Sequence, residues 1–83
     1  MILFSFDIST AMLWRMKNET QKLGSNLKRI RISKAMSQGD IARALNVARS
    51  FVSDLENGKR NPTLSTIAKL AKAIGVSADQ LLK

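Results

Sequence analysis

Apolar residues recur at intervals of three and four from residue 23 onward, which is the spacing of helices that bury one face. The pattern stays helical to the end of the chain, so the expected fold class is all-α. It predicts five short helices, over 24–34, 38–45, 49–56, 64–74 and a last one that begins after Ser77 and ends at Leu82. Their large apolar side chains are enough to fill one small core.

Polar residues mark where several of these helices begin and end. Ser37 and Asp40 have the spacing of a capping box, in which each side chain accepts a hydrogen bond from the other residue's backbone N–H. Asn46 follows the second helix, and asparagine tolerates the left-handed backbone of a tight turn. Gly58 is expected just after the end of the third helix, where glycine is favoured.

The first 16 residues differ from the rest because 11 of them are apolar, including Phe4, Phe6 and Trp14. Residues 2–6 alternate in the manner of a short strand, and residues 8–16 have room for one or two helical turns. The segment is shorter than the ~20 apolar residues that span a bilayer, and it lacks the basic start and cleavage site of a signal peptide. We therefore expect a cytoplasmic protein with no membrane partner.

Three interpretations of this apolar segment remain open. It packs on its own domain, it contacts another copy or a partner protein, or it is an artefact of start-codon choice upstream of Met16. The expected division is an N-terminal extension over 1–22 and a folded domain over 23–83. The apolar candidates for a dimer or partner contact are Phe4, Phe6, Trp14, Leu81 and Leu82.

Composition and charge narrow the classes of function. The 83 residues fit one small domain, and 14 basic against 6 acidic residues give a net charge of +8. A compact domain this positive suits a polyanion, with nucleic acid ahead of an anionic membrane. Cysteine and histidine are absent, which removes thiolate metal sites and the commonest general base. We therefore expect no enzyme activity, no metal and no cofactor.

The helices predicted over 38–45 and 49–56 are joined by only three residues, so they must cross at a steep angle. The second helix then projects an exposed face that fits the major groove of DNA. Arginine pairs with guanine, serine donates or accepts, and aspartate accepts from cytosine. The candidate base-reading residues on this face are Arg49, Ser50, Ser53 and Asp54. The candidate phosphate contacts around it are Gln38, Arg43, Asn57, Lys59 and Arg60.

Two side chains of the 49–56 helix have more than one interpretation. Asp54 reads a base, or it bonds Arg49 or Lys59 and orients that cation, because DNA phosphates repel an unpaired carboxylate. Phe51 contacts a thymine methyl or a sugar, or it covers the core.

From residue 23 to residue 83 the chain resembles the Cro/C1-type helix-turn-helix domain of phage repressors, restriction-modification controller proteins and antitoxins. The most specific part of the match is SQGDIARALNV…SFVSDLENGKRNP, followed by the pattern of the 64–74 helix. The resemblance implies a compact five-helix, lambda-repressor-like domain in which 49–56 is the recognition helix. It also implies that Gln38 contacts a phosphate and braces that helix, and that Arg31 and Glu56 form a partly buried ion pair.

Two positions depart from the residues usual in this family. Ala35 stands where glycine usually follows the first helix, and alanine in a left-handed conformation costs roughly 1 kcal/mol. Ala48 stands where serine or threonine often caps the recognition helix, and losing such a cap costs about 0.5–2 kcal/mol. We expect both departures to change local geometry and to leave the fold intact.

The sequence thus predicts a transcription regulator, expected to act as a repressor, that binds a palindromic double-stranded DNA operator as a homodimer. The alternative is an antitoxin that holds a toxin through its apolar N-terminal segment and regulates its own operon.

Overall fold

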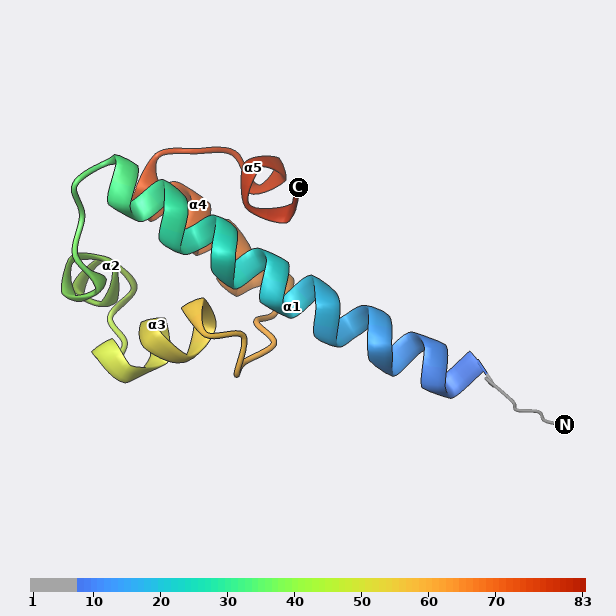
Figure 1. The fold of residues 1–83 in the computed structure, drawn as a ribbon. Helices are drawn as coiled ribbons and strands as arrows, with labels where there is room; N and C mark the ends of the chain where they lie inside the picture. The colour runs from blue at the N-terminus through green and yellow to red at the C-terminus, as the bar shows by residue number, and fades with distance from the viewer. Residues whose placement is uncertain (1–7) are drawn as a thin grey trace, which may run out of the picture.

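Five helices make up the structure, in the order that the sequence predicts (Figure 1). The computed structural model describes the backbone of residues 8–83 and the side chains from Glu19 onward. The helices are α1 (Ile8–Ser33), α2 (Gln38–Leu45), α3 (Arg49–Glu56), α4 (Leu64–Ile74) and α5 (Ala78–Leu82). The described residues contain no strand, so the expected all-α, five-helix fold is confirmed. The strand predicted over 2–6, the residues Phe4 and Phe6, and the side chain of Trp14 lie outside the described part.

One apolar face of each helix contributes to a single core. α1 packs against α3 and α5, and α4 packs against α2 and α5. Leu27, Val52 and Leu70 are completely buried where these helices meet. Leu81 is also completely buried, which removes it from the candidate dimer contacts because α5 directs it into the core of its own chain. Its neighbour Leu82 stays on the surface, 49% exposed.

The ends of α2, α3 and α4 coincide with the predicted ends, because short-range hydrogen bonds fix them. In the capping box before α2, Ser37 Oγ accepts from the backbone N–H of Asp40 at 3.0 Å, and Asp40 Oδ2 accepts from the backbone N–H of Ser37 at 2.8 Å. Asn46 ends α2 with a left-handed backbone, φ 59°. Gly58, φ 71°, follows α3, and Thr63 caps α4. The predictions for Ser37 with Asp40, for Asn46 and for Gly58 are confirmed.

α1 is the main departure from the prediction. The helix is continuous from Ile8 to Ser33, so the predicted start at residue 24 is wrong, and the division expected between residues 22 and 23 falls inside the helix. Gly24 lies mid-helix where α1 passes close to α3, and a Cβ there would lie 2.3 Å from the backbone oxygen of Leu55. Glycine therefore permits a close helix–helix approach at this position.

Ala35 follows α1 in the left-handed conformation expected for it, with φ 56°. The turn is closed by Met36, whose backbone N–H donates to the carbonyl of Arg31 at 3.0 Å. The strain of about 1 kcal/mol that alanine carries in this backbone region is present in the fold.

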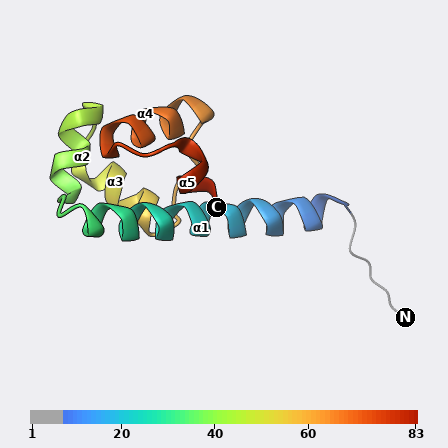
Figure 2. The ribbon, with the colours of Figure 1, turned by 90° about the horizontal axis from the view of Figure 1, so that it is seen from above.

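The N-terminal part of α1 extends past the other four helices. In Figures 1 and 2, α2 to α5 gather along one half of α1, and the other half continues away from them toward the N-terminus. We call residues 8–18 the arm. Of the described helices, none combines the length and the hydrophobicity that crossing a membrane requires.

Candidate nucleic-acid interface

α2 and α3 form a helix-turn-helix, because the chain reverses within the three residues between them. The left-handed Asn46 starts the turn, and the backbone N–H of Val47 donates to the carbonyl of Ala42 at 2.9 Å. Val52 anchors the inner side of α3 in the core, which leaves the first turn of this helix on the surface. The predicted exposure of the third helix at its arginine end is therefore present.

The first turn of α3 carries the two candidate base readers Arg49 and Ser50. Both residues are exposed. Within the described part of the chain, no side-chain hydrogen bond or ion pair engages either of them. Ala48 occupies the N-cap with φ −72° and ψ 148° and offers no capping side chain, as expected from the sequence. This end of α3 is thus open to solvent and to a ligand.

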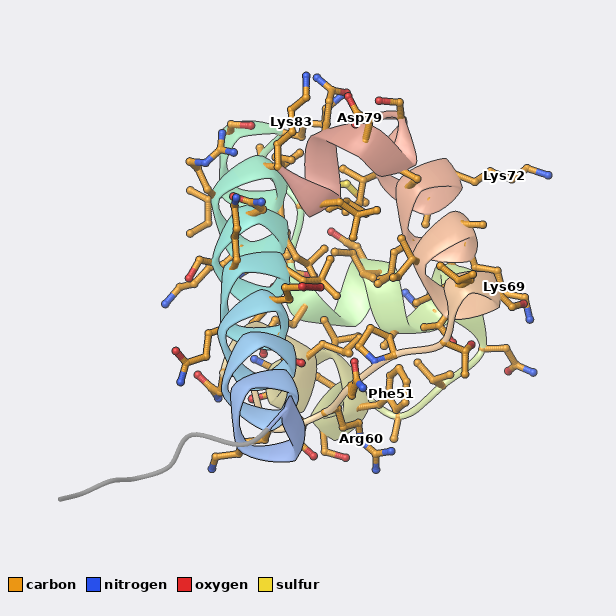
Figure 3. The ribbon with its side chains drawn as sticks, turned by 90° about the vertical axis from the view of Figure 1, so that its right-hand side faces the viewer. Phe51, Arg60, Lys69, Lys72, Asp79 and Lys83 are labelled. Atoms are coloured by element: carbon orange, nitrogen blue, oxygen red, sulfur yellow. The ribbon has the colours of Figure 1, made fainter. Side chains whose placement is uncertain are left out.

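Arg60 is held against α3 by two contacts. Its guanidinium carbon lies 4.7 Å from the centre of the Phe51 ring, in cation–π geometry, and its Nε lies 3.7 Å from Asp54 Oδ2. Figure 3 shows Phe51 and Arg60 beside each other. Of the two interpretations of Asp54, the one that pairs it with a cation named Arg49 or Lys59, whereas the structure pairs it with Arg60, from the loop after α3. Phe51 is half-buried and packs against the core, as its core-covering interpretation requires.

Glu56 closes the other end of α3 as the centre of a buried brace. Its carboxylate accepts from Arg31 Nε at 2.5 Å and Nη2 at 3.1 Å, and from Gln38 Nε2 at 3.0 Å. Arg31 also donates from Nη1 to the carbonyl of Met36 at 2.8 Å. The hydrogen bonds and charge of Glu56 raise the pKa of Arg31 above its usual value, against the opposing effect of burial. The ion pair and the bracing role that the family resemblance implies are both present.

The remaining candidate phosphate contacts are exposed, one on α2 and the others after the end of α3. Arg43 donates from Nη2 to Asp40 Oδ1 at 2.5 Å, and its side chain is 75% exposed. Asn57 donates from Nδ2 to Ser53 Oγ at 3.5 Å, a long hydrogen bond. Lys59 is exposed in the loop after α3. The backbone N–H and hydroxyl of Ser37, with a smaller contribution from Arg43, hold the pKa of Asp40 below its usual value.

Sequence reasoning missed the contacts of Arg60. This residue was expected only as a phosphate contact from a basic loop, yet it is joined to Phe51 and Asp54. Nothing in the spacing indicates the contact, since a loop rather than a helical turn brings the side chains together. The other predicted site residues lie around the exposed side of α3, and Gln38 reaches its end through Glu56.

A steeply turned helix pair, exposed at Arg49 and braced at Glu56, defines a helix-turn-helix domain of the kind that places its second helix in the major groove. The helix-turn-helix family profile matches residues 27–81 of this chain. The chain belongs to this family, the Cro/C1-type helix-turn-helix proteins, whose members are DNA-binding transcription regulators rather than enzymes.

Three relatives illustrate the similarity. The control protein C.BamHI of Bacillus amyloliquefaciens is 42% identical over 60 residues, which cover 71% of this chain and 74% of the relative. The restriction-modification controller protein C.AhdI of Aeromonas hydrophila has a crystal structure that is 34% identical, with a TM-score of 0.73 over 77% of this chain and 97% of that one. The controller protein C.Esp1396I, solved as a tetramer with its natural 35-base-pair operator, is 29% identical, with a TM-score of 0.66 over 77% of this chain and 95% of that one.

Proposed function

We propose that this chain binds a palindromic DNA operator as a homodimer and represses transcription where the operator overlaps a promoter. Each α3 lies in the major groove of one half-site, and the two-fold symmetry of the protein matches that of the DNA. The operator-bound tetramer of C.Esp1396I supports DNA binding by an assembly of several copies.

One observation carries the proposal. Arg49 is exposed at the first turn of α3, with no side-chain partner in the described part of the chain, while Glu56 is tied to both α1 and α2. Because α3 is held at Glu56 and no described side chain engages the guanidinium of Arg49, that guanidinium is available to contact a base. The bidentate pairing of arginine with guanine O6 and N7 needs such placement.

The surrounding residues divide into two roles. Ser50 joins Arg49 at the base edges, and Ser53 and Asp54 lie further along the same side of α3. The phosphate contacts are Gln38, Arg43, Asn57, Lys59 and Arg60. Gln38 Nε2 donates one hydrogen to Glu56, so the second amide hydrogen remains to meet a phosphate oxygen while the first braces α3.

The test begins with selection of bound duplexes from a random pool, which reports whether DNA is bound, which bases are read and how far apart the half-sites lie. Affinity for the selected site is then measured for Arg49→Ala and for the matched control Arg29→Ala, which removes an equal charge from the exposed side of α1. Arg49→Ala should lose about 1–3 kcal/mol at one base pair of each half-site and relax the preference there. Arg29→Ala should keep the preference.

Two results would contradict the proposal. One is a pool that yields no enriched sequence, and the other is an enriched site that Arg49→Ala and Arg29→Ala bind with the same base preference as the unaltered chain. A reporter gene placed behind the selected site then tests repression, which requires lower expression when the protein is present. No contact in the described part of the chain favours the antitoxin alternative.

A further inference from the structure

We propose that the arm of α1 (residues 8–18) is a dimerisation element that lies antiparallel to α1 of a second copy and covers an apolar groove on that copy. This inference rests on the proposed function in one respect, because a two-fold pair is what a palindromic site requires. It adds the surface through which the pair forms.

The first observation is that the core-facing row of α1 continues beyond the core. Thr20, Leu23 and Leu27 are buried on one side of the helix, at intervals of three and four. Because α1 is continuous from Ile8, the same spacing carries this row back to positions 16 and 13, which are Met16 and Leu13. The row is covered by α3 and α5 only as far as the globular part reaches, and the arm extends past them (Figures 1 and 2).

The second observation is an open groove directly at the base of the arm. It has a volume of about 200 Å³ and lies between α1, the loop before α4, and the two last helices. Leu23, Pro62, Ile67 and Leu82 supply its apolar lining. Leu82 is 49% exposed there, so the described residues leave about half of this large apolar side chain uncovered.

Charge points to a second copy as the occupant. Two chains of net charge +8 repel one another wherever basic surfaces meet, and the lining of this groove contains neither lysine nor arginine. Its one charged residue is Glu19, the only acidic residue in α1. The arm of an incoming copy brings Arg15 and Lys17, so opposite charges meet at the place where apolar surface is free.

In an antiparallel pair, both copies make the same contact. With a two-fold axis across α1 near the base of the arm, each arm passes over the groove of the other copy, and the contact closes on itself without leaving a free arm.

The test compares matched lysine substitutions in the full chain by sedimentation equilibrium without DNA. Met16→Lys changes a position of the arm in register with Thr20 and Leu23, and Ser25→Lys adds the same charge at an exposed position of α1 outside the arm. Leu82→Lys lies in the groove, and Ala68→Lys adds the same charge at an exposed position of α4. Met16→Lys and Leu82→Lys should each raise the dimer dissociation constant by at least about tenfold, because symmetry counts every substitution twice. The two controls should leave it near that of the unaltered chain.

Far-ultraviolet circular dichroism and thermal unfolding show whether each variant keeps its fold, and binding to a single selected half-site shows whether α3 is intact. Loss of the dimer in both test variants, with fold and half-site binding kept, supports the inference. An unaltered chain that remains monomeric at the highest concentration overturns it and leaves the arm to a different partner, and so does a dimer that Met16→Lys and Leu82→Lys leave intact. If the dimer responds as expected but no DNA sequence is selected, the proposed function fails and the dimerisation element stands.

Discussion

Glu56 has a carboxylate that is only 2% exposed and is paired with the guanidinium of Arg31. Burying a charge is costly unless it is paired and its hydrogen-bonding capacity is filled. Arg31 and Gln38 fill that capacity here, and no buried side-chain nitrogen or oxygen in the described part of the chain lacks a partner. Such a pair contributes little net stability compared with apolar packing, but it fixes geometry. At Glu56 it fixes the end of α3 relative to α1 and α2.

Removing one member of this brace should be severe. Glu56→Ala leaves the partly buried guanidinium of Arg31, 12% exposed, without its charge partner and should lower the free energy of unfolding by about 3–5 kcal/mol. Urea denaturation followed by circular dichroism measures the change. The comparison is Asp79→Ala, which breaks an exposed pair with Lys83 (Figure 3) and should cost below about 1 kcal/mol. Equal losses in the two variants would show that Glu56 is not a brace.

Asp40 gives the capping box a dependence on pH. Its pKa is held below the ordinary value in the folded chain, so the box stabilises the fold above the unfolded pKa of about 3.9, and this contribution is lost as the pH falls through the folded pKa. Ser37→Ala removes the hydroxyl that helps hold the pKa down and should therefore raise it toward the ordinary value. Titration of the Asp40 carboxyl by carbon-13 NMR in both proteins measures the shift. Identical midpoints would rule out the hydroxyl as a cause.

At the scale of elements, the predictions hold where the determinants are local. Ser37 with Asp40, Asn46 and Gly58 are signals within a few residues of the ends they mark, and α2 and α3 begin and end where predicted. The predicted start of α1 at residue 24 is wrong. The glycine at that position does not begin the helix; it accommodates the backbone of α3, which lies more than thirty residues later in the chain. Contacts across such separations have no periodicity to reveal them.

The residues of the candidate site also differ in whether local sequence signals predict their positions and contacts. The exposed side of α3, with Arg49 and Ser50 at its open end, follows from helical spacing and the three-residue turn. The pairing of Arg31 with Glu56 came from family resemblance and not from spacing, since these residues lie in different helices. The contact of Arg60 with Phe51 came from neither, because it depends on the path of the loop after α3.

The close approach at Gly24 can be tested directly. Gly24→Ala places a Cβ 2.3 Å from the carbonyl oxygen of Leu55 and 2.8 Å from that of Glu56, so α1 and α3 must separate. The variant should lose roughly 1–3 kcal/mol of unfolding free energy, although alanine is the better helix former. Ser25→Ala, the next position and exposed, should change stability by no more than about 0.5 kcal/mol. A Gly24→Ala protein as stable as the unaltered chain would contradict the close packing.

On the scale of the whole molecule, the net charge of +8 is not confined to the side that carries α3. Arg49, Lys59 and Arg60 are exposed on α3 and the loop after it. Lys69 and Lys72 point outward from α4, away from Phe51 and Arg60 (Figure 3). A molecule that binds DNA through one oriented surface should use only the first group, whereas one that binds by overall charge should use both.

The dependence of DNA affinity on salt separates these two cases. Lys59→Ala should weaken binding to all sequences alike and reduce the slope of log K against log salt by about 1, because one phosphate contact is lost. Lys72→Ala removes the same charge from α4 and should leave the slope unchanged. Filter-binding titrations at several salt concentrations measure both. Equal changes in slope would indicate binding by net charge rather than through an oriented surface.

The attachment of Arg60 to Phe51 and Asp54 has a practical consequence for anyone who wishes to redirect this protein to a new DNA sequence. A chimera that imports only α3 from a relative would separate Arg60 from the ring and the carboxylate that hold it. The graft should therefore extend from Arg49 through Arg60, so that the loop residue and the helix residues that contact it are transferred together.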